Sequence, residues 1–417
     1  MMDFSSGIHR RRALGLIGAA PLAAFAGTET SGPAPDPPRE LRPAGADSGS
    51  LYPEIMRLAD RQPFSHSFLG DRFRDVEAFS KEGRELTLAT LGPRPDPVDP
   101  KPEVVDRRDM GEFVCEKVVF STTPEFRVPA YVLSPKNFNG RAPAIVDLHS
   151  HGGMFLFGKE KVVDLGQNHP AMVEYHKVNY GGRPTATALV RRGYVVIAID
   201  AFFFGERRLM MDEDLGYGWD RSKYSAEDVK HLNARCRAKE RTLVQSLIYA
   251  GMTWPGIVVW DDIRTVDYLV TRPDVDPKRI GCVGVSLGGY RSLFLAGLDD
   301  RIAAGCVVGF MSTVRPMIRR HIDTHSFVHF VPSLHRHLDL PDVVSLRAPK
   351  PLLVQQCRRD SLFPLAGMEE SVEKIAAIYK KAGAADQFTG RFYDLPHIFN
   401  IDMQEDAFAW FDKHLKD

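Results

Sequence analysis

Residues 279–298, RIGCVGVSLGGYRSLFLAGL, decide the fold of this chain. The run Arg279–Val285 is short and apolar, as in a strand that is buried on both faces of a sheet. The run Tyr290–Leu298 carries apolar side chains at helical spacing and predicts a helix. Between the two runs, Gly284-Val285-Ser286-Leu287-Gly288 has the spacing G-x-S-x-G. A buried strand that turns directly into a buried helix indicates an α/β sheet.

Strands and helices alternate on both sides of this unit. Glu116–Thr122 and Arg127–Ser134 flank a short polar turn and predict a hairpin. The other predicted strands are Ala144–Leu148, Tyr194–Ile199, Ala304–Val308, Pro351–Gln355 and Phe388–Tyr393. The other predicted helices are Thr185–Arg192, Ile257–Thr271, Val372–Ala382 and Ala407–Leu415. This order predicts an α/β fold with a doubly wound, mostly parallel sheet and helices on both faces.

The sheet-forming domain is predicted over residues 116–417, and a helical extension over residues 51–115 precedes it. The two helices expected in the extension lie near Ile55–Arg61 and Asp71–Lys81. Two insertions, at about residues 201–255 and 310–350, interrupt the alternation of strands and helices. Long excursions after strands are where α/β proteins build lids and substrate pockets, so we expect pocket walls in both insertions.

The N-terminus predicts an export signal over residues 1–26. Three arginines from Arg10 precede the apolar run Ala13–Phe25, which is too short for a stable membrane span. Ala24-Phe25-Ala26 fits a small-x-small cleavage site. The paired arginines resemble a twin-arginine signal, which implies a periplasmic or secreted protein. An uncleaved membrane anchor is the alternative. Residues 27–50, rich in Pro, Gly, Ala and Ser, predict a disordered linker.

Charge and cysteine content exclude several classes of protein. Lys+Arg and Asp+Glu are both 54, so the formal net charge is 0 and nothing draws the chain toward nucleic acid or, after signal cleavage, toward membranes. Five cysteines are scattered without a C-x-x-C spacing, which argues against a disulfide framework or a zinc finger. The amino-acid sequence does not specify an oligomeric state.

Ser286 is the predicted nucleophile. Small residues at positions 284 and 288 permit the tight, strained turn that lifts a serine hydroxyl to the top of the sheet. The backbone N–H of Leu287, at the start of the following helix, is then expected to face a developing oxyanion. A glycine-rich strand end that binds phosphate is the alternative interpretation, although neither a Rossmann nor a Walker spacing is present.

A serine nucleophile requires a base and an orienting acid, and in this kind of fold the acid follows the serine along the chain and the base comes last. His397 comes directly after the last predicted strand and is the candidate base. Asp360 follows the strand Pro351–Gln355 and is the candidate acid. Asp394 is a weaker rival, because it lies only three residues before His397.

The loop His149-Ser150-His151-Gly152-Gly153 follows the strand Ala144–Leu148 and is expected to supply a second oxyanion donor. Its glycines allow backbone N–H groups to approach a substrate closely. The candidates are the N–H groups of His151 and Gly152. A metal site that uses the two imidazoles of the loop is a second interpretation, which we rank lower, and no metal or other cofactor is expected.

Together, these motifs resemble the α/β-hydrolase superfamily. Further short sequence motifs are similar to those of its dienelactone-hydrolase-like and acetylxylan-esterase-like branch of bacterial carboxylesterases. They are Asp200-Ala201 with Gly205-Glu206-Arg207, Trp260-Asp261-Asp262, and Ala348-Pro349-Lys350-Pro351-Leu352-Leu353. The resemblance implies a sheet of about eight strands and two-step ester hydrolysis through an acyl-enzyme. Dienelactone hydrolases proper use cysteine where this chain has Ser286.

Three side chains in the insertions are expected near the substrate. Phe202 and Phe203 follow a strand and predict an aromatic pocket wall, although aromatic clusters also form plain core. His321, His325 and His329 recur every four residues and predict one helical face. We interpret that face as a polar pocket wall or a solvated helix side, with His325 as the candidate substrate-pocket residue; zinc binding is the alternative.

The sequence therefore predicts a serine carboxylesterase that acts on short-acyl or carbohydrate-linked esters. A serine peptidase of the prolyl-oligopeptidase type is one alternative, but no propeller-length extension precedes the domain. A binding protein on an inactive hydrolase scaffold is another, and the intact serine, aspartate and histidine argue against it. The last alternative is a metal-binding protein that uses the histidine-rich insertion.

Overall fold

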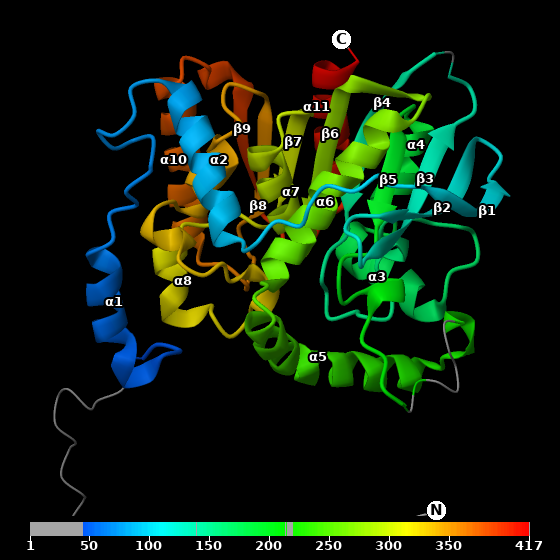
Figure 1. Cartoon of the computed structure of the whole chain (residues 1–417), viewed down its shortest axis with the longest axis horizontal. Coiled ribbons are helices and arrows are strands. Elements are labelled where there is room, and N and C mark those ends of the chain that lie inside the picture. The colour runs from blue at the N-terminus through cyan, green and yellow to red at the C-terminus, as the bar shows by residue number, and fades with distance from the viewer. Residues whose placement is uncertain (1–44, 139, 213, 215–219, 417) are drawn as a thin grey trace, which may run out of the picture. The chain divides into compact units, whose positions relative to one another are not determined.

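The computed structural model describes residues 45–416, except for 139, 213 and 215–219 (Figure 1). The predicted signal peptide, 1–26, and linker residues 27–44 lie outside the described residues. Residues 45–50, the end of the predicted disordered linker, correct that prediction. The Asp47 N–H donates to the Arg319 carbonyl (2.8 Å), and Arg320 donates to the Gly45 carbonyl (2.9 Å). These backbone contacts order a segment that has no apolar pattern of its own.

The described chain contains one nine-stranded sheet with the order β1-β2-β3-β5-β4-β6-β7-β8-β9. Its strands are β1 (Glu103–Asp109), β2 (Phe113–Ser121), β3 (Arg127–Pro135), β4 (Ala142–Leu148), β5 (Val195–Ile199), β6 (Val275–Val285), β7 (Ile302–Val308), β8 (Leu352–Cys357) and β9 (Phe388–Tyr393). Strands β1, β2, β3 and β5 pair antiparallel, and every pair from β5 to β9 is parallel. The predicted mostly parallel α/β sheet is confirmed, with one strand more than the eight expected.

The helices surround the sheet and connect its strands (Figure 1). They are α1 (Tyr52–Asp60), α2 (Val76–Thr90), α3 (Pro170–Tyr180), α4 (Thr185–Arg191), α5 (Ala226–Tyr249), α6 (Trp254–Thr271), α7 (Leu287–Leu298), α8 (Val314–Arg320), α9 (Leu340–Ser345), α10 (Leu365–Lys381) and α11 (Ile401–Leu415). Each helix predicted from residue 185 onward is present. The second helix of the extension begins at Val76 rather than near Asp71, because Asp75 caps it by accepting the Ala78 N–H.

Helices cover both faces of the sheet. On β6, Cys282 contacts the α7 backbone at Ser292, whereas a side chain at the adjacent position Gly281 would meet Phe411 of α11. Neighbouring residues of a strand point to opposite faces, so α7 and α11 lie on opposite faces. The Asp262–Arg291 ion pair joins α6 to α7, with both side chains fully buried (2.6 Å). The doubly wound arrangement is therefore confirmed.

Strand β1 corrects the predicted boundary of the helical extension. Residues 51–115 contain α1 and α2, but they also contain β1 and the start of β2. β1 is an edge strand with sequence EVVDRRD, and all but one of its residues are exposed. An exposed, charged edge strand has no buried face and therefore no apolar alternation for sequence analysis to detect.

Helices α5 and α6 meet at a sharp bend after the first insertion. No single helix in the described part of the chain is long and apolar enough to cross a membrane. By length and composition alone, the pair α5 and α6 passes that test together, with an 81° bend between them.

The turn from β6 into α7 touches the end of β4. Ser286 at this turn has φ +60°, a conformation that side chains other than glycine rarely adopt. A methyl group added at Gly284 or at Gly288 would overlap the carbonyl oxygen of Leu148, the last residue of β4. Hydrogen alone fits at both positions, so the turn and the start of the next loop lie in direct contact.

Asp147, one residue earlier on β4, is a buried acid without an ion-pair partner among the described residues. The Thr185 hydroxyl donates to its carboxyl group (2.5 Å). Burial raises the pKa of Asp147 to about 7, although the Thr185 hydrogen bond and the Arg291 charge oppose that rise. The folded state therefore retains a proton on Asp147 over a pH range in which the unfolded chain has lost it.

Gly288→Ala should lower stability by about 2 kcal/mol or more, because a backbone carbonyl cannot move aside as a flexible side chain would. Thermal unfolding of the purified variant measures this loss. Ser292→Ala is the control in the same buried helix; its hydroxyl has no hydrogen-bond partner in the described structure, so its removal should cost little. A Gly288→Ala variant as stable as Ser292→Ala would contradict the close contact.

Asp147→Asn should stabilise the fold increasingly as pH rises. Between about pH 4 and pH 7 the folded wild type binds one more proton than the unfolded chain, so its stability falls through that window. Asparagine cannot ionise, and its advantage should approach roughly 4 kcal/mol above pH 7. Denaturant unfolding at pH 5, 6, 7 and 8 measures the difference, and a gap that does not change with pH would contradict the raised pKa.

Candidate active site

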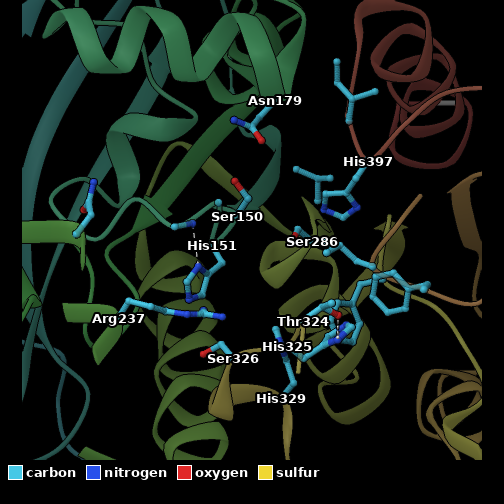
Figure 2. A pocket seen from close by; sticks show the side chains of 18 of the residues that line it. Ser150, His151, Asn179, Arg237, Ser286, Thr324, His325, Ser326, His329 and His397 are labelled. Atoms are coloured by element: carbon cyan, nitrogen blue, oxygen red, sulfur yellow. Dashed lines mark hydrogen bonds between the residues drawn. The ribbon is translucent and has the colours of Figure 1, made fainter. Parts of the chain in front are cut away.

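A cavity of about 460 Å³ opens at the carboxyl ends of the parallel strands (Figure 2). Segments that are far apart in the sequence contribute to its lining. The residues with polar side chains that line it are Ser150, His151, Asn179, Asn233, Arg237, Ser286, Thr324, His325, Ser326, His329 and His397. The long insertions predicted to build pocket walls therefore do so, through α5 and through the segment after α8.

Ser286 stands at the entrance to α7 and lines this cavity. Its backbone N–H donates to the Val308 carbonyl of β7 (3.0 Å), which fixes the turn on the neighbouring strand. Leu287 is the first residue of α7, so its N–H has no acceptor within the helix. The strained turn thus presents a hydroxyl and the positive end of a helix on the same side of the sheet.

His397 and Asp360 form a hydrogen-bonded pair beside Ser286. Nδ1 of His397 donates to Oδ2 of Asp360 at 2.6 Å, and the Leu362 N–H donates to the other carboxylate oxygen at 2.8 Å. The Asp360 side chain is fully buried, whereas that of His397 is 19% exposed. The carboxylate fixes the imidazole as the Nδ1–H tautomer, which leaves Nε2 as a lone-pair acceptor.

The second ring nitrogen of His397 is available for chemistry. Nε2 is buried and has no hydrogen-bond partner among the described residues, while the ring lines the same cavity as Ser286. Asp394, the rival acid, is 81% exposed and pairs with Arg359 instead (3.1 Å). The structure thus brings together the three residues predicted from chain order and leaves the rival outside.

The loop His149–Gly153 forms the cavity wall at the end of β4. His151 accepts the Gly153 N–H at Nδ1 (3.0 Å), so its Nε2–H donates to Glu240 of α5 (3.2 Å). The other oxygen of Glu240 accepts from the hydroxyl of Ser326 (2.9 Å). Burial lowers the pKa of His151, although the Glu240 hydrogen bond opposes this, so the imidazole is a neutral part of the wall at neutral pH.

Glu240 is a structural hub that the sequence does not reveal. It is almost fully buried and joins the loop of β4 to both insertions through His151 and Ser326. Helix α5 carries many charged residues and no motif, so no local signal separates this glutamate from its solvated neighbours. Arg237, one turn earlier on α5, lines the cavity (Figure 2), and no local signal in the sequence marks it either.

Two histidines of the second insertion, His325 and His329, line the cavity, but His321, His325 and His329 do not share a helical face. α8 ends at Arg320, and a turn then leads to a short 3₁₀ helix, Phe327–His329. The four-residue spacing was a misleading signal, since Ser326 caps the short helix and interrupts any continuous one. His325 and His329 nevertheless meet edge to face, with ring centroids 5.5 Å apart. His325, predicted as a substrate-pocket residue, lines the cavity, and its contact with a substrate stays a prediction.

Both imidazoles present uncharged nitrogens to the cavity. Nδ1 of His325 donates to the His321 carbonyl (2.7 Å), while its Nε2 has no partner in the described structure. Neither ring nitrogen of His329 has one. Burial lowers the pKa of both side chains, that of His329 more strongly. No three His, Cys, Asp or Glu side chains in the described part of the chain are arranged to hold a metal ion.

Phe202 and Phe203 do not line the cavity, which corrects their predicted role. The ring of Phe203 packs between those of Phe155 and Trp254, with centroids 5.6 and 5.3 Å away. Phe202 instead packs against Phe126 (5.8 Å). Phe203 lies at a turn (φ +79°) and its ring is buried in the core, whereas Phe202 is only partly buried beside the exposed side chain of Phe126. Phe310 and Phe363 supply the aromatic lining instead.

Buried ion pairs support the wall from below. Lys159 contacts both Asp200 (2.8 Å) and Glu206 (2.5 Å), and its own side chain is fully buried. Arg207 pairs with Asp261 (2.6 Å). The sequence segments around residues 200–207 and 260–262 therefore form a structural network of charged side chains rather than part of the cavity lining.

Comparisons with known proteins agree with this fold. "Putative hydrolase YtaP" of Bacillus subtilis (strain 168) is 28% identical over 307 residues, which are 73% of this chain and 89% of that protein. A crystal structure of "a putative acetyl xylan esterase" from Bacteroides fragilis NCTC 9343 aligns with TM-score 0.62 and 18% identity, covering 85% of this chain and 86% of that one. A glucuronoyl esterase from Solibacter usitatus aligns with TM-score 0.55 and 15% identity, covering 82% and 94%.

The sequence model of the Abhydrolase family matches residues 57–398, a span that includes Ser286, Asp360 and His397. The structural likenesses share the α/β-hydrolase type of sheet, which confirms the predicted fold class. Because the match extends from α1 to the loop that carries His397, the chain belongs to the Abhydrolase family.

Proposed function

We propose that this protein is a serine carboxylesterase that works through an acyl-enzyme. The observation that carries the proposal is the 2.6 Å hydrogen bond between Asp360 and His397, in the same cavity as a serine held on a strained turn. This arrangement supplies the nucleophile, the base and the orienting acid that acyl transfer requires. The hydrolase name of the Bacillus subtilis relative supports the reaction class.

In the first step, Nε2 of His397 takes the proton of the Ser286 hydroxyl as Oγ attacks the ester carbonyl carbon. Asp360 stabilises the imidazolium that forms. The N–H groups of Leu287 and of His151 or Gly152 stabilise the oxyanion of the tetrahedral intermediate. Collapse of the intermediate breaks the ester C–O bond, and His397 returns the proton to the departing alcohol. Water, deprotonated by His397, then attacks the acyl-enzyme and releases the acid.

The preferred substrates are esters of short acyl groups on a polar alcohol such as a carbohydrate. The cavity is small, about 460 Å³, and polar side chains form much of its lining. Uncharged nitrogens of His325 and His329 can accept hydrogen bonds from hydroxyl groups. Phe310 packs against His329, with ring centroids 4.7 Å apart, and offers an apolar surface beside those acceptors. Structural neighbours named as acetyl xylan and glucuronoyl esterases are consistent with this class.

Ser286→Ala should reduce kcat for p-nitrophenyl acetate by a factor of about 10⁴ or more, since no other nucleophile stands at the turn. Stability should change little, because alanine adopts the same backbone conformation with the same strain. Initial rates on p-nitrophenyl esters from acetate to octanoate measure the loss, and wild-type activity should fall steeply with acyl length. Reaction of the wild type, but not of the variant, with a fluorophosphonate probe identifies the nucleophile. Undiminished ester hydrolysis by the variant would refute the proposal.

His329→Phe should raise KM for an acetylated xylo-oligosaccharide about tenfold while it leaves KM for p-nitrophenyl acetate within twofold. The substitution keeps an aromatic ring and removes both nitrogens, so it deletes one hydrogen-bond acceptor and one donor without emptying the wall. Steady-state kinetics on both substrates measure the split, and p-nitrophenyl acetate, which has no hydroxyl groups, is the internal control. Equal effects on the two substrates would argue against recognition of hydroxyl groups at this position.

A further inference from the structure

Lys161 is a fully buried lysine directly behind the cavity wall. It ends the short 3₁₀ helix Lys159–Lys161. Its Nζ donates to the carbonyl oxygens of Ser150 (2.8 Å) and His151 (3.0 Å), the two residues at the centre of the loop after β4. The rings of Phe204 and Tyr175 surround the amine, with centroids 4.5 and 5.6 Å from Nζ. The amine therefore reaches the loop from the side of the core.

Lys161 lacks the partners that buried lysines ordinarily have. Its neighbour Lys159 is equally buried but contacts three carboxylates, from Glu160, Asp200 and Glu206. In the described structure, no carboxylate lies within ion-pair distance of Lys161. Burial of an unpaired amine is costly, and an aliphatic side chain would pack there at lower cost. The contacts that distinguish a lysine at this position are its two hydrogen bonds to the loop.

The same two carbonyls also have donors from within the loop region. Ala201 N–H donates to Nε2 of His149 (3.1 Å), so Nδ1 of His149 carries the proton and donates to the Ser150 carbonyl (3.0 Å). The His151 carbonyl accepts the Met154 N–H (3.2 Å). Two successive peptide groups are thus held with their oxygens directed toward the core.

Holding these oxygens also sets the direction of two N–H groups. In a trans peptide, the C=O of one residue and the N–H of the next point in opposite directions. The carbonyls of Ser150 and His151 therefore fix the N–H groups of His151 and Gly152 on the opposite side of the loop. Both residues line the cavity, and neither N–H has a hydrogen-bond partner within the described residues.

From this geometry we infer that Lys161 is a positioning residue for the oxyanion site: it holds two carbonyls so that the N–H groups of His151 and Gly152 face the reacting ester. The inference rests on the proposed esterase function and adds a residue that never touches substrate. Burial lowers the pKa of Lys161 well below its ordinary value, opposed chiefly by the charge of Asp200. A neutral amine still has two N–H bonds, one for each carbonyl.

Lys161→Met is the test, because methionine keeps the unbranched stem and removes the donors. The kcat for p-nitrophenyl acetate should fall about 10- to 100-fold, while KM changes less than about threefold, since the donors act on the transition state. Affinity for a trifluoromethyl ketone, whose serine adduct carries the same oxyanion, should fall by a similar factor. A side chain that only supported the fold would not weaken this analogue in proportion to kcat.

Lys381→Met is the control for loss of lysine-to-carbonyl hydrogen bonds, at a residue that is exposed rather than buried. Lys381 also donates through Nζ to backbone carbonyls, those of Phe68, Gly70 and Phe73, and it also lies over an aromatic ring, that of Phe68. This lysine holds a loop that takes no part in the cavity lining. The control should lose thermal stability and keep wild-type kcat and analogue affinity.

The outcomes separate the inference from the proposed function. A folded Lys161→Met variant with wild-type kcat, or with an altered KM alone, would overturn the role of Lys161 and leave the esterase intact. If Lys161→Met does not fold, Lys161→Gln provides the test: its amide keeps a donor on a shorter stem, so kcat should fall while KM holds, and unchanged kcat overturns the inference. A wild-type protein inert to both esters and a fluorophosphonate would instead refute the esterase function itself.

Discussion

The candidate site depends on one close contact, between the turn at Ser286 and the last carbonyl of β4. Gly284 and Gly288 leave no room for a side chain against Leu148, so the nucleophile turn lies directly against the strand that begins the His149–Gly153 loop. A serine on a more distant turn could not share an oxyanion site with that loop. The strain at Ser286, φ +60°, is sustained because the turn is held by β6, β7 and α7, which pack against one another.

Buried polar groups beneath the cavity hold the wall in a fixed geometry. Glu240 joins the β4 loop to both insertions, and Lys161 holds two successive carbonyls of that loop. Such groups are expensive to bury unless their hydrogen bonds are made, so their contacts restrain the wall to few alternative arrangements. The cavity can therefore keep unpaired N–H groups and imidazole nitrogens facing inward, because the surrounding network prevents the chain from collapsing onto them.

Sequence analysis best predicted which residues lie close together where their place in the strand order decides it. Ser286, Asp360 and His397 each come directly after a strand, and parallel strands bring their carboxyl ends to one edge.

Sequence analysis failed where tertiary contacts decide the local structure. β1 is a charged edge strand without an apolar pattern, and the regular spacing of His321, His325 and His329 concealed a turn. Phe203 packs in the core, and the partly buried Phe202 packs against Phe126, so neither ring lines the cavity. Neither Glu240 nor Lys161 carries a local signal, because burial alone distinguishes them.

The charge distribution of the cavity bears on what it can accept. Arg237 is the one lining cation in the described structure, and Glu240 partly neutralises it at 3.3 Å. Burial lowers the pKa of His151, His325 and His329, so these rings are neutral hydrogen-bonding groups at neutral pH. A lining of neutral acceptors and donors beside the rings of Phe310 and Phe363 suits an uncharged polyhydroxylated ligand better than an anionic one. The same neutrality suits the proposed ester hydrolysis, because the negative charge that would develop on the ester oxygen then meets oriented N–H groups rather than a mobile cation.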